Sequence, residues 1–161
     1  MSQQAPPSAP PPPPPGKVLA VDPGERRIGF AISDPERKFS FPLTQIERTT
    51  PERDAIRVIE LVKEERVVLI VVGLPLLGRG EEGASADRAR ALGTWLAQVT
   101  GLPIVYCDES YSTRLAEKKL WAAGLSHAQR KARRDAVAAQ GILETWIESG
   151  CPEGRPDSAG P

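Results

Sequence analysis

The chain has few of the residues that define several common classes of site. Only two cysteines, Cys107 and Cys151, occur in 161 residues, and their contexts give neither metal-ligand spacing nor a disulfide framework. We therefore expect reduced thiols in a reducing, cytoplasmic compartment. The one histidine, His127, follows Gly-Leu-Ser, where nothing in the sequence positions it as a general base, so we expect it at the surface.

Long hydrophobic runs and an excess of charge are absent as well. The longest apolar run, residues 67–72, is too short to cross a bilayer, and no basic region precedes an apolar stretch near the N-terminus. We therefore expect no membrane partner. Lys plus Arg and Asp plus Glu both number 21, so a nucleic-acid partner would be held by a local patch of charge, and a histone-like polycation is excluded.

Composition divides the chain into one domain and two tails. Residues 1–16 carry no charged side chain and eight of the 17 prolines, which predicts a disordered, polyproline-type tail. Docking to a proline-reading partner is the alternative role for this tail. Residues 150–161 have a similar composition, and we expect them to be disordered too. Residues 17–149 then form a single domain of ordinary size.

Hydrophobic periodicity within this domain predicts an α/β fold. The pattern favours strands over 17–21, 28–33, 41–46, 67–72 and 104–107, with helices from residue 51, around 89–99, at 112–123 and at 133–148. This order predicts a five-stranded mixed sheet with helices on both faces. The carboxyl ends of the parallel strands are where such a sheet places its site.

Carboxylates are found at those strand ends. Asp22 ends the first predicted strand, Glu109 follows the last one, and Asp135 lies on the apolar face of the final helix. Small residues at Ala138 and Ala139 would let this helix approach the sheet closely and bring Asp135 towards Asp22.

Gathered carboxylates repel one another unless cations lie between them, so this arrangement predicts a metal site. Oxygen ligands without His or Cys suit Mg²⁺ or Mn²⁺, and two such ions would clamp the attacking and leaving oxygens of a phosphodiester. The structural alternatives are that Asp22 is a turn residue and that Asp108-Glu109 caps a helix.

A basic stretch lies between two of these carboxylates. Residues 110–134 contain seven Lys and Arg side chains against the single acid Glu117, and two further arginines follow the turn after Asp22. This pattern predicts contact with nucleic-acid phosphates, while an ordinary solvated helix face is the alternative. The predicted nucleic-acid contacts are Arg26, Arg27, Arg114, Lys118, Lys131, Arg133 and Arg134. Three tryptophans at helical apolar positions, Trp95, Trp121 and Trp146, are predicted to be core residues.

Four segments resemble, in order and spacing, the YqgF/RuvX family. They are Asp-Pro-Gly-Glu-Arg-Arg-Ile-Gly at 22–29, Val-Val-Gly-Leu-Pro at 71–75, Asp-Glu-Ser-Tyr-Ser-Thr at 108–113 and Asp-Ala-Val-Ala-Ala at 135–139. The resemblance covers about residues 17–148. It implies a ribonuclease H-like fold and acidic metal-binding positions at Asp22, Glu109 and Asp135. The family usually has Arg where this chain has Ser110, and an Asn/Asp-containing loop where it has residues 76–80, so the departures concern substrate contacts.

The resemblance implies a metal-dependent nuclease that uses two Mg²⁺ or Mn²⁺ ions. Its substrate would be structured RNA, in processing of the 5′ end of pre-16S ribosomal RNA, or alternatively branched DNA, in resolution of Holliday junctions during recombination and repair. The sequence allows a homodimer. Two other classes stay open, a nucleotide-binding protein of the actin and sugar-kinase type and a nucleic-acid-binding module without catalysis. The first normally needs two lobes, and a domain of about 133 residues supplies one.

Overall fold

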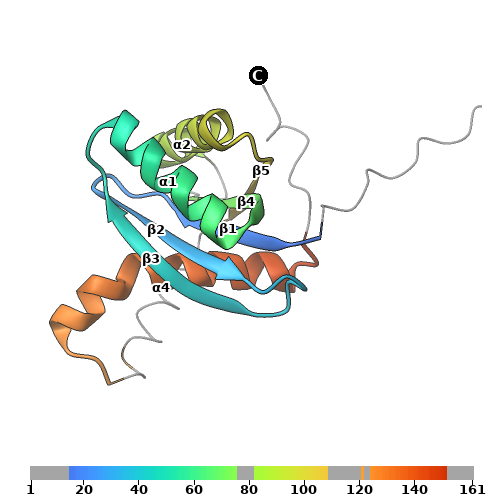
Figure 1. Cartoon of the computed structure of the whole chain (residues 1–161). Coiled ribbons are helices and arrows are strands. Elements are labelled where there is room, and N and C mark those ends of the chain that lie inside the picture. Colours follow the sequence, from blue (N-terminus) through green and yellow to red (C-terminus); the bar gives the residue numbers. More distant parts are fainter. Residues whose placement is uncertain (1–14, 76–81, 109–120, 122–123, 152–161) are drawn as a thin grey trace, which may run out of the picture.

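A five-stranded mixed sheet organises the residues that the computed structural model describes, which are 15–75, 82–108, 121 and 124–151 (Figure 1). The strand order across the sheet is β3-β2-β1-β4-β5. Strand β2 runs antiparallel to both of its neighbours, β1 and β3, whereas β4 runs parallel to both β1 and β5. The strands are β1 Lys17–Asp22, β2 Arg27–Ser33, β3 Ser40–Glu47, β4 Val67–Leu74 and β5 Ile104–Asp108. The predicted sheet is confirmed.

Helices cover both faces of this sheet (Figure 1). Helices α1 (Pro51–Glu65) and α2 (Ala84–Thr100) lie on one face, and α4 (His127–Glu148) crosses the other. The predicted helix at 112–123 falls mostly outside the described residues, as do the predicted tails over 1–14 and 152–161. None of the described helices combines the length and apolar character that a membrane span requires.

Local capping explains where two of the helices begin. The Thr50 side chain accepts a hydrogen bond from the Arg53 backbone N–H, and Pro51 occupies the first helical position of α1, as predicted. Helix α4 begins at 127, six residues before the predicted start at 133. Ser126 and Gln129 form a reciprocal capping box there, which satisfies two backbone N–H groups and so makes the earlier start favourable.

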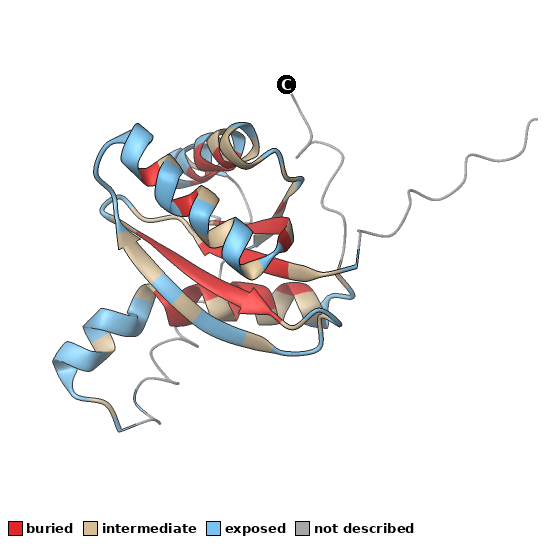
Figure 2. Ribbon diagram, viewed as in Figure 1, coloured by how far each residue is buried: buried red, intermediate tan, exposed pale blue. Residues whose placement is uncertain are grey.

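The central strand β1 is buried on both faces, which gives the protein two apolar layers (Figure 2). Leu19 and Val21 pack in the layer under α1 and α2, whereas Val18 and Ala20 pack in the layer under α4. This alternation follows from the two-residue period of a strand. Figure 2 also shows that the first half of α4 extends beyond the sheet and is exposed, while the second half is buried against it.

Gly29 is the point at which α4 comes closest to the sheet. A Cβ atom at this position would collide with the backbone carbonyl of Asp135 and would lie 2.9 Å from the Asp135 Cβ. Real Cβ atoms do not approach heavy atoms so closely, and the backbone of a helix packed along a sheet has little freedom to retreat. A residue without a side chain at Gly29 therefore sets the distance between α4 and β2.

Gly29→Ala should lower the free energy of unfolding by about 3 kcal/mol, because the added methyl group forces α4 away from the sheet. Urea denaturation followed by circular dichroism measures this change. Gly93→Ala is the matched control on the opposite face, since its Cβ would meet the hydroxyl end of Tyr106, a side chain that can move. We expect a cost of about 1 kcal/mol there. Equal stability of Gly29→Ala and the parent would contradict this account of α4 packing.

Candidate active site

Two of the predicted site residues, Asp22 and Asp135, lie on the face of the sheet that α4 covers. Asp22 ends β1 and is directly opposite Gly29 in the antiparallel register with β2. It continues the alternation of Val18 and Ala20, so its side chain projects to the α4 face. The backbone of Asp135 lies over Gly29. Asp22 and Asp135, which are 113 positions apart in the sequence, are therefore neighbours at the carboxyl edge of the parallel strands.

The carboxylate of Asp135 is half-buried and pairs with an arginine. Its Oδ2 atom lies 3.3 Å from Nε of Arg27, the first residue of β2. Burial raises the pKa of Asp135 above its ordinary value, and the positive charges of Arg27 and Arg134 oppose that rise without cancelling it. The fold thus holds a negative charge at a position where solvation is incomplete, as the sequence predicted for a carboxylate on an apolar helix face.

The third predicted ligand, Glu109, lies outside the described residues. The residue before it, Asp108, ends β5 and is exposed, and its Cα is paired with that of Leu74 at the end of β4. Within the residues that the structure describes, no three His, Cys, Asp or Glu side chains are grouped closely enough to hold a metal ion. The described part of the site therefore consists of Asp22 and Asp135 from β1 and α4.

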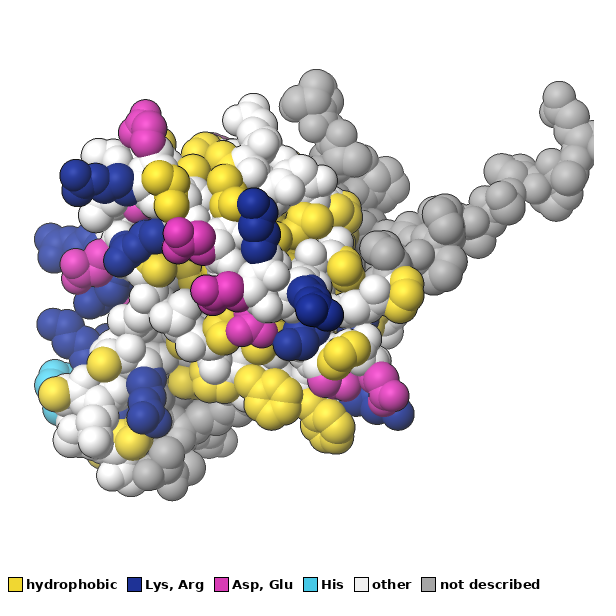
Figure 3. All heavy atoms as spheres, viewed as in Figure 1, with side chains coloured by type: hydrophobic (Ala, Val, Ile, Leu, Met, Phe, Trp, Pro, Cys, Tyr) yellow, Lys and Arg dark blue, Asp and Glu magenta, His cyan; other side chains and the backbone are white. Residues whose placement is uncertain are grey.

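The predicted phosphate-binding residues divide into three groups. Lys131, Arg133 and Arg134 are exposed on the first half of α4, and Arg26 is exposed in the turn after β1. Arg27 is only partly exposed and is engaged with Asp135. Figure 3 shows Lys and Arg side chains gathered along the edge of the molecule where α4 begins. Arg114 and Lys118 lie outside the described residues.

The tryptophan predictions are correct for one residue and wrong for another. Trp146 is 1% exposed and lies in the core under α4, as predicted. Trp121 was predicted to be a core residue but is 67% exposed, and the Arg130 guanidinium lies 3.9 Å from its ring centroid. The physical reason is that the part of α4 near Trp121 extends past the sheet, and the described residues there form no apolar layer that receives the indole ring. Trp95 is partly exposed: it packs against the core and also lines a hollow in the surface.

Sequence reasoning missed two arginines next to the turn that follows Asp22. Arg48, directly after β3, donates a hydrogen bond from Nη1 to the Gly24 carbonyl at 3.1 Å, and its backbone N–H donates to the Arg26 carbonyl at 2.8 Å. Arg88 of α2 lies 3.4 Å from the Glu25 carboxylate. The only available signal was strand register, because these contacts join residues 22 or more positions apart along the chain.

Comparison with solved structures shows which fold the chain has. The chain superposes on RuvC of Thermus thermophilus in complex with a Holliday junction substrate with a TM-score of 0.54 and 18% identity, covering 84% of this chain and 97% of that one. The fowlpox virus resolvase in complex with Holliday junction DNA gives a TM-score of 0.53 and 10% identity, covering 84% and 99%. The fold is therefore the ribonuclease H-like fold of the junction resolvases, as the sequence predicted.

Sequence comparison then identifies the family. The family model of RuvX, described as a Holliday junction resolvase, matches residues 16–149. A candidate pre-16S rRNA nuclease of Maridesulfovibrio salexigens is 41% identical over 131 residues, covering 81% of this chain and 97% of that protein. Another from Rhodopirellula baltica is 40% identical over 134 residues, covering 83% and 78%. The chain belongs to the RuvX family, and its nuclease function follows from that membership.

Asp135→Asn should raise the free energy of unfolding at pH 7 in metal-free buffer. Because the folded-state pKa of Asp135 lies above the unfolded one, ionisation destabilises the folded state. This destabilisation is fully present above the folded-state pKa and disappears as the pH falls below the unfolded value of about 3.9. The advantage of the variant should therefore shrink on acidification, which urea denaturation between pH 7 and pH 4 would measure.

Asp87→Asn provides the control for this measurement. Asp87 is exposed in the first turn of α2, where the helix dipole favours a negative charge. We therefore expect the substitution to be neutral or slightly destabilising at pH 7. If Asp135→Asn did not raise the free energy of unfolding at pH 7 above the value for Asp87→Asn, the conclusion that the ionised Asp135 carboxylate destabilises the folded state would be wrong.

Proposed function

We propose that this protein is a divalent-metal-dependent nuclease that hydrolyses the phosphodiester backbone of pre-16S ribosomal RNA near its 5′ end. The observation that carries the proposal is the convergence of Asp22 and Asp135 over Gly29 at the carboxyl edge of the parallel strands. The basic side chains at the start of α4 lie on the helix that supplies Asp135, so a phosphate backbone bound there would lead to both carboxylates.

The residues present fit a hard divalent cation. Asp22 and Asp135 offer carboxylate oxygens, the ligands that such a cation prefers, and the pKa of Asp135 is raised because burial leaves its charge poorly solvated. Asp22, Asp135 and Glu109 would hold Mg²⁺ or Mn²⁺. The metal would supply Lewis-acid stabilisation of the charge that develops on the phosphate. Arg27 holds the Asp135 carboxylate in place, and the exposed Lys and Arg side chains bind the substrate backbone.

Resolution of Holliday junctions is the second candidate function. It is supported by the description of the RuvX family and by the fold shared with the two junction resolvases. The names of the sequence relatives favour the ribosomal precursor instead, since those relatives are 40–41% identical to this chain and the resolvases 10–18%. Contacts to phosphates alone would serve either substrate, because they carry no sequence information.

Cleavage and binding should fail separately when the two charge groups are changed. Asp22→Asn or Asp135→Asn removes a metal ligand and a charge that repels phosphate, so cleavage should collapse while metal-free affinity for nucleic acid stays the same or rises. Neutralising Lys131, Arg133 and Arg134 should weaken binding and reduce its salt slope by up to about 0.9 per lost contact with duplex DNA. Kinetic assays and fluorescence anisotropy would measure the two effects.

Matched variants away from the first half of α4 and from the start of α1 control for net charge. Glu60→Gln removes one exposed carboxylate from α1, and neutralising Lys38, Lys63 and Arg66 removes three exposed cations. Neither should change cleavage appreciably. Cleavage by Asp135→Asn at the rate of the parent would show that the carboxylate assignment is wrong, and normal binding by the α4 triple variant would show that nucleic acid lies elsewhere.

The choice of metal and substrate can be tested with one preparation of the full chain. We expect cleavage of a pre-16S precursor fragment with Mg²⁺ or Mn²⁺ but poor cleavage with Ca²⁺, whose looser coordination does not enforce octahedral geometry. A four-way DNA junction of matched size should be cut more slowly. Rapid cleavage in excess chelator would exclude the metal mechanism, and faster cleavage of the junction would favour the second candidate function.

A further inference from the structure

Two adjoining hollows on the α2 face form a groove that begins at the turn after Asp22, across the edge of the sheet from the α4 face. They share three lining residues, Arg48, Arg88 and Leu92. The larger, with a volume of about 470 Å³, extends between the start of α1 and α2 as far as Trp95. The smaller reaches the Pro23-Gly24 turn that directly follows Asp22. We call these two hollows together the arginine groove.

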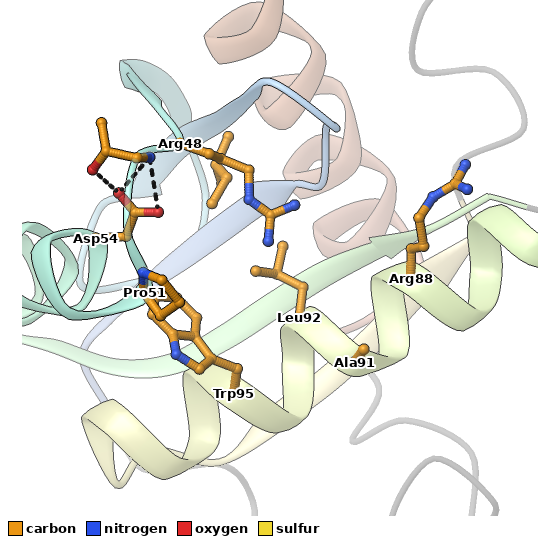
Figure 4. Close-up of a pocket in the computed structure, with 9 residues that line it drawn as sticks. Arg48, Pro51, Asp54, Arg88, Ala91, Leu92 and Trp95 are labelled. Atoms are coloured by element: carbon orange, nitrogen blue, oxygen red, sulfur yellow. Dashed lines mark hydrogen bonds between the residues drawn. The ribbon is translucent and has the colours of Figure 1, made fainter.

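The arginine groove combines an apolar floor with cationic side chains. Ile28 and Leu92, which are 1% and 4% exposed, form part of the floor, and Trp95 lies at the end farther from Asp22. In Figure 4 the Arg48 side chain extends over Leu92, and Arg88 stands nearer the beginning of α2. An aromatic ring beside two guanidinium groups is the combination that binds unpaired bases and their phosphates.

The carboxylates that line the groove are already committed to protein groups. Asp54 is buried and accepts hydrogen bonds from the Thr49 backbone N–H at 3.1 Å and from the Thr49 hydroxyl at 3.0 Å (Figure 4). It therefore supports the loop that carries Arg48. Glu25 pairs with Arg88 at 3.4 Å, but both side chains are exposed. An exposed pair of this kind contributes little free energy, so a phosphate could replace Glu25 as the partner of Arg88.

We propose that the arginine groove binds a single-stranded segment of the substrate that continues from the scissile phosphate, with a base stacked on Trp95 and phosphates bound by Arg48 and Arg88. The assignment rests on the proposed nuclease function, because that function places the scissile phosphate at Asp22. A single strand is the ligand that fits, because a paired base inside a duplex cannot offer its face to the indole ring.

The length of the groove agrees with a short strand. Ser85, at the near end, and Trp95, at the far end, are ten residues apart on α2, which corresponds to about 15 Å at 1.5 Å per residue. At about 3.4 Å per nucleotide, four stacked nucleotides would occupy that distance.

The test measures binding of an eight-nucleotide single-stranded RNA and of a blunt RNA duplex of the same length to the full chain without metal. Arg88→Gln should reduce the salt slope for the single strand by about 0.7. Trp95→Leu should weaken single-strand binding about fivefold or more, and Trp95→Phe should retain most of the affinity because it keeps an aromatic face. Binding of the duplex should be unchanged in all three variants.

Lys63→Gln, at the far end of α1, is the control for the loss of one positive charge and should leave both probes unaffected. Thermal unfolding checks each variant, and if Trp95→Leu does not fold, Trp95→Phe and Arg88→Gln still decide the question. Unchanged single-strand binding in the folded variants overturns the proposal, as does equal loss for both probes. Unchanged single-strand binding would instead favour a protein as the occupant of the groove.

The same variants separate this proposal from the proposed function. If the chain binds single-stranded RNA through Trp95 and Arg88 but cuts neither the precursor nor the junction, the nuclease assignment fails and the groove assignment stands. If the parent cuts and the groove variants cut and bind equally well, the groove assignment fails and the nuclease assignment stands.

Discussion

The close approach of α4 to the sheet at Gly29 is the contact on which the rest of the site depends. Because β2 carries no side chain there, the backbone of Asp135 can lie against the strand, and its carboxylate comes to the same face as that of Asp22. Any larger residue would raise the helix and separate the two carboxylates. The same packing continues along α4, where Ala139 and Ile142 fill the layer below the sheet. The candidate site and the core under α4 therefore both require that this helix lie close to the sheet.

The ionised carboxylate of Asp135 at this contact lowers the stability of the folded state. Asp135 is partly withdrawn from water, which raises its pKa, and Arg27 offsets only part of the cost. Charges gathered at functional positions commonly work against the stability of the fold that holds them. In this protein the remaining apolar layers supply the compensation, since β1 is buried on both faces and Trp146 is enclosed beneath α4.

The distribution of charge explains how a protein without net charge can serve an anionic substrate. Equal numbers of acids and bases cancel overall, but the cations on the first half of α4 lie on a part of the helix that extends past the sheet. Lys131, Arg133 and Arg134 are exposed to solvent there. The arginines of the groove, Arg48 and Arg88, are different, because each also contacts the turn after Asp22. The proposed binding of substrate in the groove would therefore be linked to the geometry of that turn.

The sequence by itself determined the elements and the places of two candidate carboxylates, Asp22 and Asp135. Period-two and period-3.6 patterns report directly on burial, and Asp135 on an apolar helix face already required a nearby partner. It did not determine that Trp121 would be exposed, that α4 would begin at His127, or that Arg48 and Arg88 would border one groove with Trp95. Those features depend on how far a helix extends past a sheet and on which distant segments become neighbours. Only tertiary packing decides this, because local patterns carry no information about contacts between residues that are far apart in the chain.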